Sequence, residues 1–243
     1  MRNYKVEGII IKRKNFGEAD RLITVFSKEK GKLRLVAKGS RRPLSKMAGH
    51  LGQMSHVHLV IAKGRNLDII TSATTLESYD NKNLSEISEM FSLSEIIDKF
   101  LPEHDPSPKV YELIKEILPY LAESLALAYF KLNFLKETGF APQLFECVRC
   151  SGEINDKQNG FDIDEGGIVC HNCNEELTSV NNDMIKLMRL AIEKDWQFIR
   201  KLGVKEPIEE QLNLIATQML THKISDNLKS ERFIDELKGL QTV

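Results

Sequence analysis

Two pairs of cysteines constrain this chain more than any other feature of its sequence. The pairs are CVRC at residues 147–150 and CHNC at residues 170–173. Each C-x-x-C turn directs two thiolates at one ion, and two such pairs at this spacing are a strong signal for zinc. Four thiolates complete a tetrahedral site and leave no position open for water, which is typical of a structural ion. We therefore predict one structural Zn²⁺ bound by Cys147, Cys150, Cys170 and Cys173.

The rest of the sequence favours a metal over disulfides. The N-terminal stretch MRNYKVEGIIIKRK places charges every few residues, unlike a signal peptide, and the longest apolar run is LALAYF at 125–130. A membrane helix needs roughly 20 apolar residues. We expect a cytoplasmic protein without membrane contact, where disulfides are rare and iron or a redox pair are the alternatives to zinc. Residues 160–170 are expected to form a hairpin between the pairs, and His171 is expected to lie outside the ligand set.

Residues 1–80 contain five short segments with the pattern of β-strands. They are rich in β-branched residues and cover 5–12, 21–27, 32–39, 56–64 and 67–78. The third alternates strictly, with Leu33, Leu35 and Ala37 on one face and Lys32, Arg34, Val36 and Lys38 on the other. Five strands in so short a stretch favour a small closed barrel, because closure removes exposed edges. The five-stranded OB-fold is the leading interpretation, with an SH3-like barrel as the alternative.

Positive charge is concentrated in this first part of the chain. The whole chain has a formal charge of −1, but residues 1–80 hold 16 basic and 7 acidic residues, whereas residues 81–243 hold 18 and 28. Such asymmetry indicates that residues 1–80 bind a polyanion. The candidate nucleic-acid contacts are Lys12, Arg13, Arg21, Lys32, Arg34, Lys38, Arg41, Arg42 and Lys46, with Lys14 beside them.

The run LVAKGSRRPLSK, residues 35–46, carries four of these cations and no acid. We interpret it as the end of the third strand and a loop that follows a phosphate backbone. Gly39-Ser40 and Pro43 are expected to keep the run out of the core and free to follow a flexible strand. Aromatic residues for base stacking are sparse: Phe16 is the better exposed candidate, and Phe26 is expected in the core.

From residue 83 the apolar residues recur with helical spacing. Helices are predicted over 83–101, 109–121, 123–138, 183–201, 207–223 and 226–238. Their apolar stripes are most simply the core of a bundle. The predicted fold is therefore a multidomain α+β protein, with an OB-fold barrel over residues 1–80 and a helical bundle domain over residues 81–243. The four-cysteine zinc module, residues 144–178, is inserted in the second domain.

The motifs exclude several classes of enzyme. The sequence has no P-loop, no G-x-G-x-x-G, no H-E-x-x-H and no G-x-S-x-G. A zinc-dependent nucleic-acid deaminase needs an open zinc position and a glutamate in H-x-E, and neither is present. A zinc-ribbon adaptor of transcription or translation remains an alternative to a DNA-binding protein. A strand-annealing assay would separate the two.

Residues 6–59 resemble the N-terminus of the bacterial RecO family of recombinational repair proteins. The similarity includes EGII at 7–10, GEADRL at 17–22, the GK turn at 31–32, and AKGSRRP at 37–43 followed by SK at 45–46. The later order also fits, with helices, the two cysteine pairs and a terminal helix containing LKSERFI at 228–234.

The resemblance implies an OB-fold followed by a helical domain with a zinc module, and a protein that is not an enzyme. It implies binding to single- and double-stranded DNA, annealing of complementary strands, and a cytoplasmic location at the nucleoid. Implied partners are the acidic C-terminal tail of single-stranded-DNA-binding protein, RecR and sometimes RecF, with RecA loaded onto DNA as the outcome. The acidic part of the chain, residues 81–243, is expected to provide the protein contacts. Lys131 and Lys136, beside Phe130 and Phe134, are candidates for binding the acidic tail of single-stranded-DNA-binding protein.

Overall fold

The computed structural model describes residues 3–79, 83–155, 158–174, 177–224, 228–230 and 234. These residues divide into two compact units. The first unit extends to Pro119 and includes the segment from Leu228, and the second comprises Tyr120–Asn227. Within the part of the chain that the structure describes, no helix is long and apolar enough to span a bilayer.

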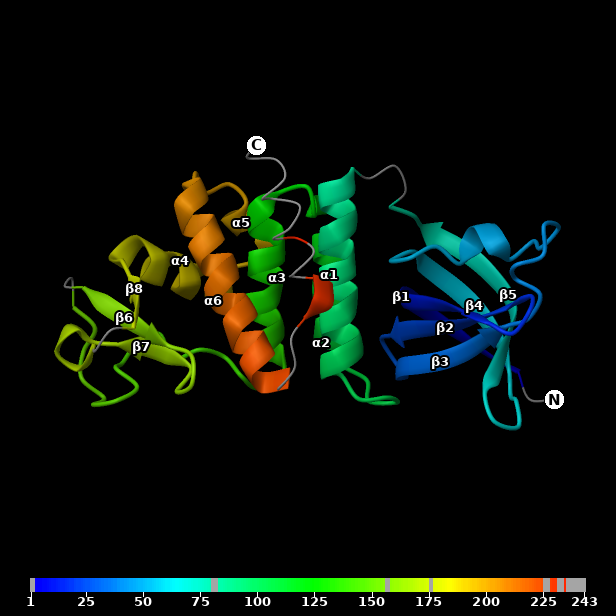
Figure 1. The fold of residues 1–243 in the computed structure, drawn as a ribbon, viewed down its shortest axis with the longest axis horizontal. Helices are drawn as coiled ribbons and strands as arrows, with labels where there is room; N and C mark the ends of the chain where they lie inside the picture. Colours follow the sequence, from blue (N-terminus) through cyan, green and yellow to red (C-terminus); the bar gives the residue numbers. More distant parts are fainter. Residues whose placement is uncertain are drawn as a thin grey trace. The chain divides into compact units, whose positions relative to one another are not determined.

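The first unit contains a closed five-stranded barrel (Figure 1). Its strands are β1 (Asn3–Phe16), β2 (Asp20–Ser27), β3 (Gly31–Ala37), β4 (His56–Ala62) and β5 (Asp68–Glu77). Their order around the barrel is β1-β2-β3-β5-β4, with β3 and β5 parallel and the other neighbours antiparallel. This arrangement confirms the predicted OB-fold over the SH3-like alternative.

The interior of the barrel follows the alternation of the sequence. Leu33, Leu35 and Ala37 of β3 point into the core with Ile23 and Val25 of β2, as predicted. The opposite face of β3 is only partly open to solvent, because Lys32 and Val36 are buried as well, whereas Arg34 and Lys38 are exposed. Part of this face is therefore covered by segments that follow the barrel.

Two helices complete the first unit. α1 (Leu84–Phe100) begins where the side chain of Asn83 accepts a hydrogen bond from the Glu86 N–H at 2.9 Å. α2 (Pro108–Ile117) starts with proline at its first position and is followed by a 3₁₀ turn, η2 (Leu118–Tyr120). Tyr111 of α2 packs against Phe26, with ring centroids 6.3 Å apart. Phe26 is fully buried, as expected.

These contacts group α1 and α2 with the barrel rather than with the remaining helices. The boundary predicted at residue 80 still marks the end of the barrel strands, since β5 ends at Glu77. A fragment of residues 1–80 would expose Phe26 and Lys32, which are buried in the whole chain. The division of function between residues 1–80 and residues 81–243 therefore stays a prediction that intact protein has to test.

The second unit is built on α3 (Ser124–Glu137), which is buried on almost every side. It packs with α4 (Asn182–Glu193) and α6 (Glu206–Ile224). The helix predicted over 183–201 is broken after Glu193. The Asp195 side chain accepts a hydrogen bond from the Phe198 N–H at 2.9 Å and starts a separate short helix, α5 (Trp196–Ile199).

That break lets the single tryptophan of the chain enter the core. Trp196 is fully buried, and its ring centroid lies 5.4 Å from that of Tyr129 and 6.0 Å from that of Tyr120. The helix predicted over 226–238 lies largely outside the described residues, although positions 229, 230 and 234 are helical.

A three-stranded sheet of order β7-β6-β8 lies between α3 and α4 in the sequence. β6 (Asn159–Asp162) and β7 (Gly167–Val169) form the hairpin predicted between the cysteine pairs. β8 (Thr178–Val180) adds a third strand that the sequence did not suggest, and the second cysteine pair overlaps a 3₁₀ turn, η3 (His171–Cys173).

Candidate metal centre and nucleic-acid interface

The four cysteines converge as their spacing predicts. Their Sγ atoms all lie within 4.8 Å of one another. The first pair is held in a turn by the Ser151 N–H, which donates to the Cys147 carbonyl at 2.8 Å, and the second by the Cys173 N–H, which donates to the Cys170 carbonyl at 3.0 Å. The hairpin β6–β7 returns the chain so that both turns face one point. This group can hold one tetrahedral metal ion.

The pKa values of the clustered thiols are shifted in opposite directions. Burial raises the pKa of Cys147, but N–H donors from Cys170, Cys150 and Arg149 outweigh it and lower this pKa to about 6. Hydrogen bonding to Cys150 and Cys170 raises the pKa of Cys173 to about 12. Without a metal the cluster therefore favours a mixture of thiolate and thiol. A divalent ion would replace the shared protons and favour four thiolates.

One residue of this module was missed by sequence reasoning. Arg149, inside the first C-x-x-C turn, donates to the Cys173 carbonyl at 2.9 Å and pairs with Asp162 of β6 at 2.9 Å. It thereby links both cysteine turns to the hairpin. The only signal in the sequence was a basic residue between two ligands. His171 is exposed, and its place outside the ligand set stays a prediction.

A second candidate site lies at the end of the barrel where β1 meets β2. In the strand register, Arg21 of β2 lies opposite Asn15 of β1 on one side and opposite Ala37 of β3 on the other. The loop after β3 is tied to the β1–β2 turn by the Arg41 N–H, which donates to the Ala19 carbonyl at 2.9 Å. The strand register and this contact bring basic segments from two parts of the sequence together.

The loop is anchored at its start, so the expectation that it is free to move is wrong there, although residues 41–44 and Lys46 are exposed and lie outside the core as expected. Ser40 is fully buried, and its hydroxyl donates to the Ala37 carbonyl at 2.9 Å. The Gly39 N–H donates to Asp20 at 2.7 Å, and Gly39 has a positive φ of 64° that favours glycine. The Arg41 guanidinium donates to the carbonyls of Gly17 and Glu18 at 3.3 and 3.1 Å. The polar residues therefore fasten the loop rather than loosen it.

The side chains on this anchored frame include seven cations, beside the two acids at the β1–β2 turn, Glu18 and Asp20. We call the seven cations the rim cluster, which consists of Arg13, Lys14, Arg21, Lys38, Arg41, Arg42 and Lys46. All but Arg21 are exposed, and Arg21 is half-buried. Within the described ranges no ion pair engages any of the seven. Phe16 belongs to the same turn region and is 48% exposed, as expected for a stacking candidate.

The other three predicted cations lie elsewhere. Lys12 and Lys32 both pair with Asp98 of α1, and Arg34 pairs with Glu103 at 2.6 Å. Lys32 is only 4% exposed, and its burial lowers its pKa against the opposing effect of Asp98. The strand alternation placed these side chains on an outer face, where α1 and the segment after it pair with all three and bury Lys32, while Lys12 and Arg34 stay partly exposed. We therefore do not include these three in the proposed interface.

We expect Lys32→Met to leave DNA affinity within about twofold of the parent and to lower stability. Removing one partner of a buried ion pair leaves the other less compensated, although Asp98 keeps its pairing with Lys12. The pKa of Lys32 in the folded protein lies below its ordinary value of 10.5. At pH values between these two pKa values, the unfolded chain therefore binds more protons than the folded chain. The parent should gain stability as pH rises through that window, and the variant should lack this gain. Chemical unfolding across pH and a DNA titration measure both effects.

The contrasting variant is Arg42→Met, which removes an exposed rim charge and should weaken DNA binding. If Lys32→Met weakened binding as much as Arg42→Met, Lys32 would have to leave its buried position to reach DNA.

Comparison with known proteins identifies the family of this chain. A family model described as recombination protein O N terminal matches residues 1–79, and one described as recombination protein O C terminal matches residues 82–232. The chain belongs to the RecO family. RecO relatives cover nearly all of it, each bearing the name DNA repair protein RecO. The relative from Dehalococcoides mccartyi is 28% identical, covering 97% of this chain and 96% of its own length.

Two further RecO relatives also match this chain over nearly its whole length. The relative from Halalkalibacterium halodurans is 26% identical over 98% of this chain and 96% of its own length. That from Thermoanaerobacter is 28% identical over 99% of this chain and its own whole length. Membership of the RecO family places this chain among DNA repair proteins and disfavours the adaptor interpretation.

Proposed function

We propose that this RecO-family chain binds single- and double-stranded DNA through the rim cluster and anneals complementary strands, without catalysing a covalent reaction. The observation that carries the proposal is an excess of seven cations over two acids, Glu18 and Asp20, in two segments at the end of an OB-fold barrel. OB-folds commonly bind oligonucleotides, and a positively charged surface that follows the backbone supplies most of the affinity.

Annealing needs such a surface because two nucleic-acid strands repel each other. Lysine and arginine side chains neutralise phosphates and release their counterions, which lowers the cost of bringing two strands together. The loop after β3 is held rigidly by Asp20 and Ala19, so its cations stay close to those of the β1–β2 turn. A rigid array loses less conformational freedom on binding than a flexible one.

We propose that the ion held by the four cysteines is zinc and that its role is structural. The donor set consists of four sulfur atoms from two C-x-x-C turns, the pattern of closed zinc sites. A closed set supports no hydrolytic chemistry, because no position is left for water. The ion would fix the module of residues 144–178 beside α4.

Protein partners also belong to the proposal. As in the family, we propose contacts with RecR, with RecF in some settings, and with the acidic tail of single-stranded-DNA-binding protein, leading to RecA loading in the cytoplasm at the nucleoid. The docking residues that the sequence suggested for the tail do not form an open site. Phe130, Phe134 and Lys131 are fully buried, and Lys131 donates to Asn213 at 2.9 Å and to Thr217 at 2.7 Å.

An annealing assay tests this function. Two complementary oligonucleotides labelled as a fluorescence pair should form duplex much faster with the protein than without it, and the acceleration should fall as salt rises. A zinc-ribbon adaptor would bind a protein or RNA and leave the rate unchanged. A rate equal to that of the free strands at low salt would refute the annealing function.

A further inference from the structure

A groove between the barrel and α1 continues from the rim cluster. It has a volume of about 480 Å³ and lies entirely within the first unit. One wall is the end of β1, the other is one face of α1, and the segment at Lys229 and Ser230 borders it. Arg13 and Lys14 belong both to the groove and to the rim cluster. A strand that follows the rim cluster along β1 therefore reaches this groove.

An exposed aromatic ring lies in the wall formed by α1. Phe91 is 50% exposed, although its neighbours in the groove, Ile11 and Ser94, are buried. Phe91, Ser94 and Asp98 recur at helical spacing and so share one face of α1. The floor is fixed by the Gln53 amide, which donates to the Ile11 carbonyl at 2.6 Å and to the Ser94 hydroxyl at 3.0 Å. The groove thus presents an apolar surface held in place by buried polar contacts.

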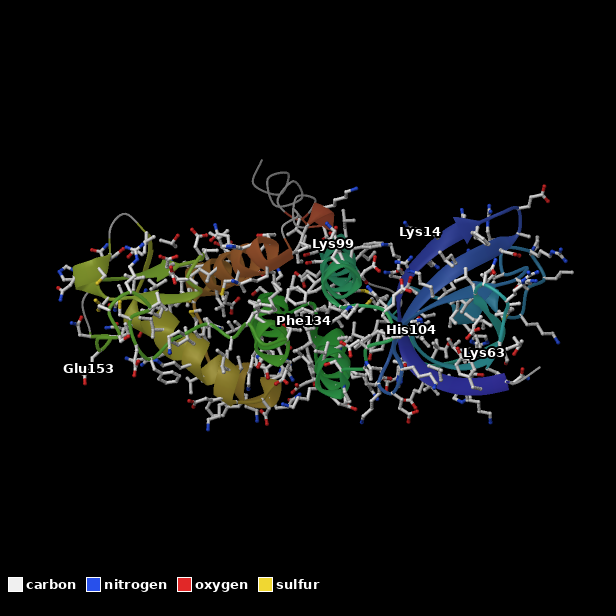
Figure 2. All side chains as sticks on the ribbon, turned by 90° about the horizontal axis from the view of Figure 1, so that it is seen from below. Lys14, Lys63, Lys99, His104, Phe134 and Glu153 are labelled. Carbon is white, nitrogen blue, oxygen red and sulfur yellow. The ribbon has the colours of Figure 1, made fainter. Side chains whose placement is uncertain are left out.

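The charges around the groove are divided between its edge and its wall. Figure 2 shows Lys14 on the barrel and Lys99 on α1 on the same side of this unit. Arg13, Lys14 and Lys229 are exposed at the edge. The carboxylates in the wall already form ion pairs, because Asp98 pairs with Lys12 and Glu95 pairs with Lys99. The Glu95 carboxylate also accepts from the Ser230 N–H and hydroxyl at 2.8 and 2.7 Å.

We propose that this groove receives an unpaired nucleobase of a bound single strand, stacked on Phe91, while the flanking phosphates lie on Arg13, Lys14 and Lys229. A base is uncharged and planar, so it suits an apolar groove whose wall carries two neutralised carboxylates. Its phosphates stay at the cationic edge. An acidic peptide would instead bring its own carboxylates beside Glu95 and Asp98. The inference deepens the proposed DNA binding and rests on it.

Stacking on one side chain would distinguish single strands from duplex. Each base presents a π-face, so the contact is tolerant of sequence, but a paired base is not available to it. The groove would hold a strand with its base exposed and release the base when a complementary strand pairs with it. The proposal assigns Phe91 a role that the charge pattern of residues 1–80 did not indicate.

The test compares a short oligothymidylate with an abasic strand of the same length, using the full-length protein. Phe91→Ala should weaken binding to oligothymidylate by about tenfold, in line with the loss of one stacked base, and leave the abasic strand unchanged. Phe198→Ala is the matched control, because Phe198 is 44% exposed but belongs to α5 in the second unit. It should bind both strands like the parent.

A second variant gives a direct signal. Phe91→Trp should keep the parent's affinity, and oligothymidylate should quench the emission of the introduced indole, whereas the native Trp196 is fully buried and should not respond. The inference is overturned if Phe91→Ala binds oligothymidylate like the parent or weakens both strands equally. It is also overturned if an acidic peptide quenches the Phe91→Trp variant and oligothymidylate does not.

Failure here is separable from failure of the proposed function. If rim-cluster variants lose affinity for both strands but Phe91→Ala loses none, DNA binding stands and this groove does not take part. If rim-cluster variants also bind like the parent, the DNA-binding proposal itself fails.

Discussion

Cys147→Ser should yield protein that contains less than one zinc per chain and has an unfolded or loosened cysteine module. Cys147 is buried with Val169 and Cys170, so it is both a proposed ligand and part of the small core of the module. Zinc in small domains contributes roughly 10–16 kcal/mol to folding, so losing one of four ligands should cost about 3 kcal/mol or more. Elemental analysis and thermal unfolding measure the two effects.

The matched control is His171→Ala, which changes an exposed residue between the ligands of the second pair. It should keep one zinc per chain and the parent's stability. Because the ligands have to lose protons, zinc should also be released as pH falls, and earlier in Cys147→Ser than in the parent. Parent protein prepared without chelators and found to contain neither zinc nor iron would contradict the structural metal.

Removing three rim charges together, by Lys38→Ala, Arg42→Ala and Lys46→Ala, should weaken binding to every DNA sequence alike. Each neutralised phosphate of a single strand contributes about −0.7 to the slope of log affinity against log salt. The triple variant should therefore flatten that slope by about 2, and annealing should slow with it. Arg41 is kept in this variant because its guanidinium fastens the loop to the carbonyls of Gly17 and Glu18.

A charge-matched control separates the rim cluster from net charge. Lys186→Ala, Lys201→Ala and Lys205→Ala remove the same charge from exposed positions of the second unit. This control should retain the parent's salt slope. Equal slopes for the parent and the rim variant would show that the loop after β3 is only a solvated surface. The DNA site would then have to lie elsewhere on the barrel.

Local patterns in the sequence were sufficient for the barrel and for the convergence of the four cysteines. Alternation along β3 identified Leu33, Leu35 and Ala37 as interior residues, because a strand turns successive side chains to opposite faces. The spacing of the two C-x-x-C turns placed all four thiols around one point, since each turn needs only its own few residues to form. The helices were located by the period of their apolar residues. Within one such continuous pattern, however, Asp195 caps a new helix, and this break lets Trp196 pack against Tyr129.

Contacts between distant segments were decided only by the tertiary structure. The exposed or buried state of a lysine on an outer strand face depends on what covers that face, and α1 covers Lys32 while leaving Arg42 open. The same packing created the groove at Phe91, whose walls come from β1, α1 and the segment at Ser230. Period and spacing describe neighbours along the chain. Desolvation and ion pairing depend on neighbours in space, such as Asp98 beside Lys12 and Lys32.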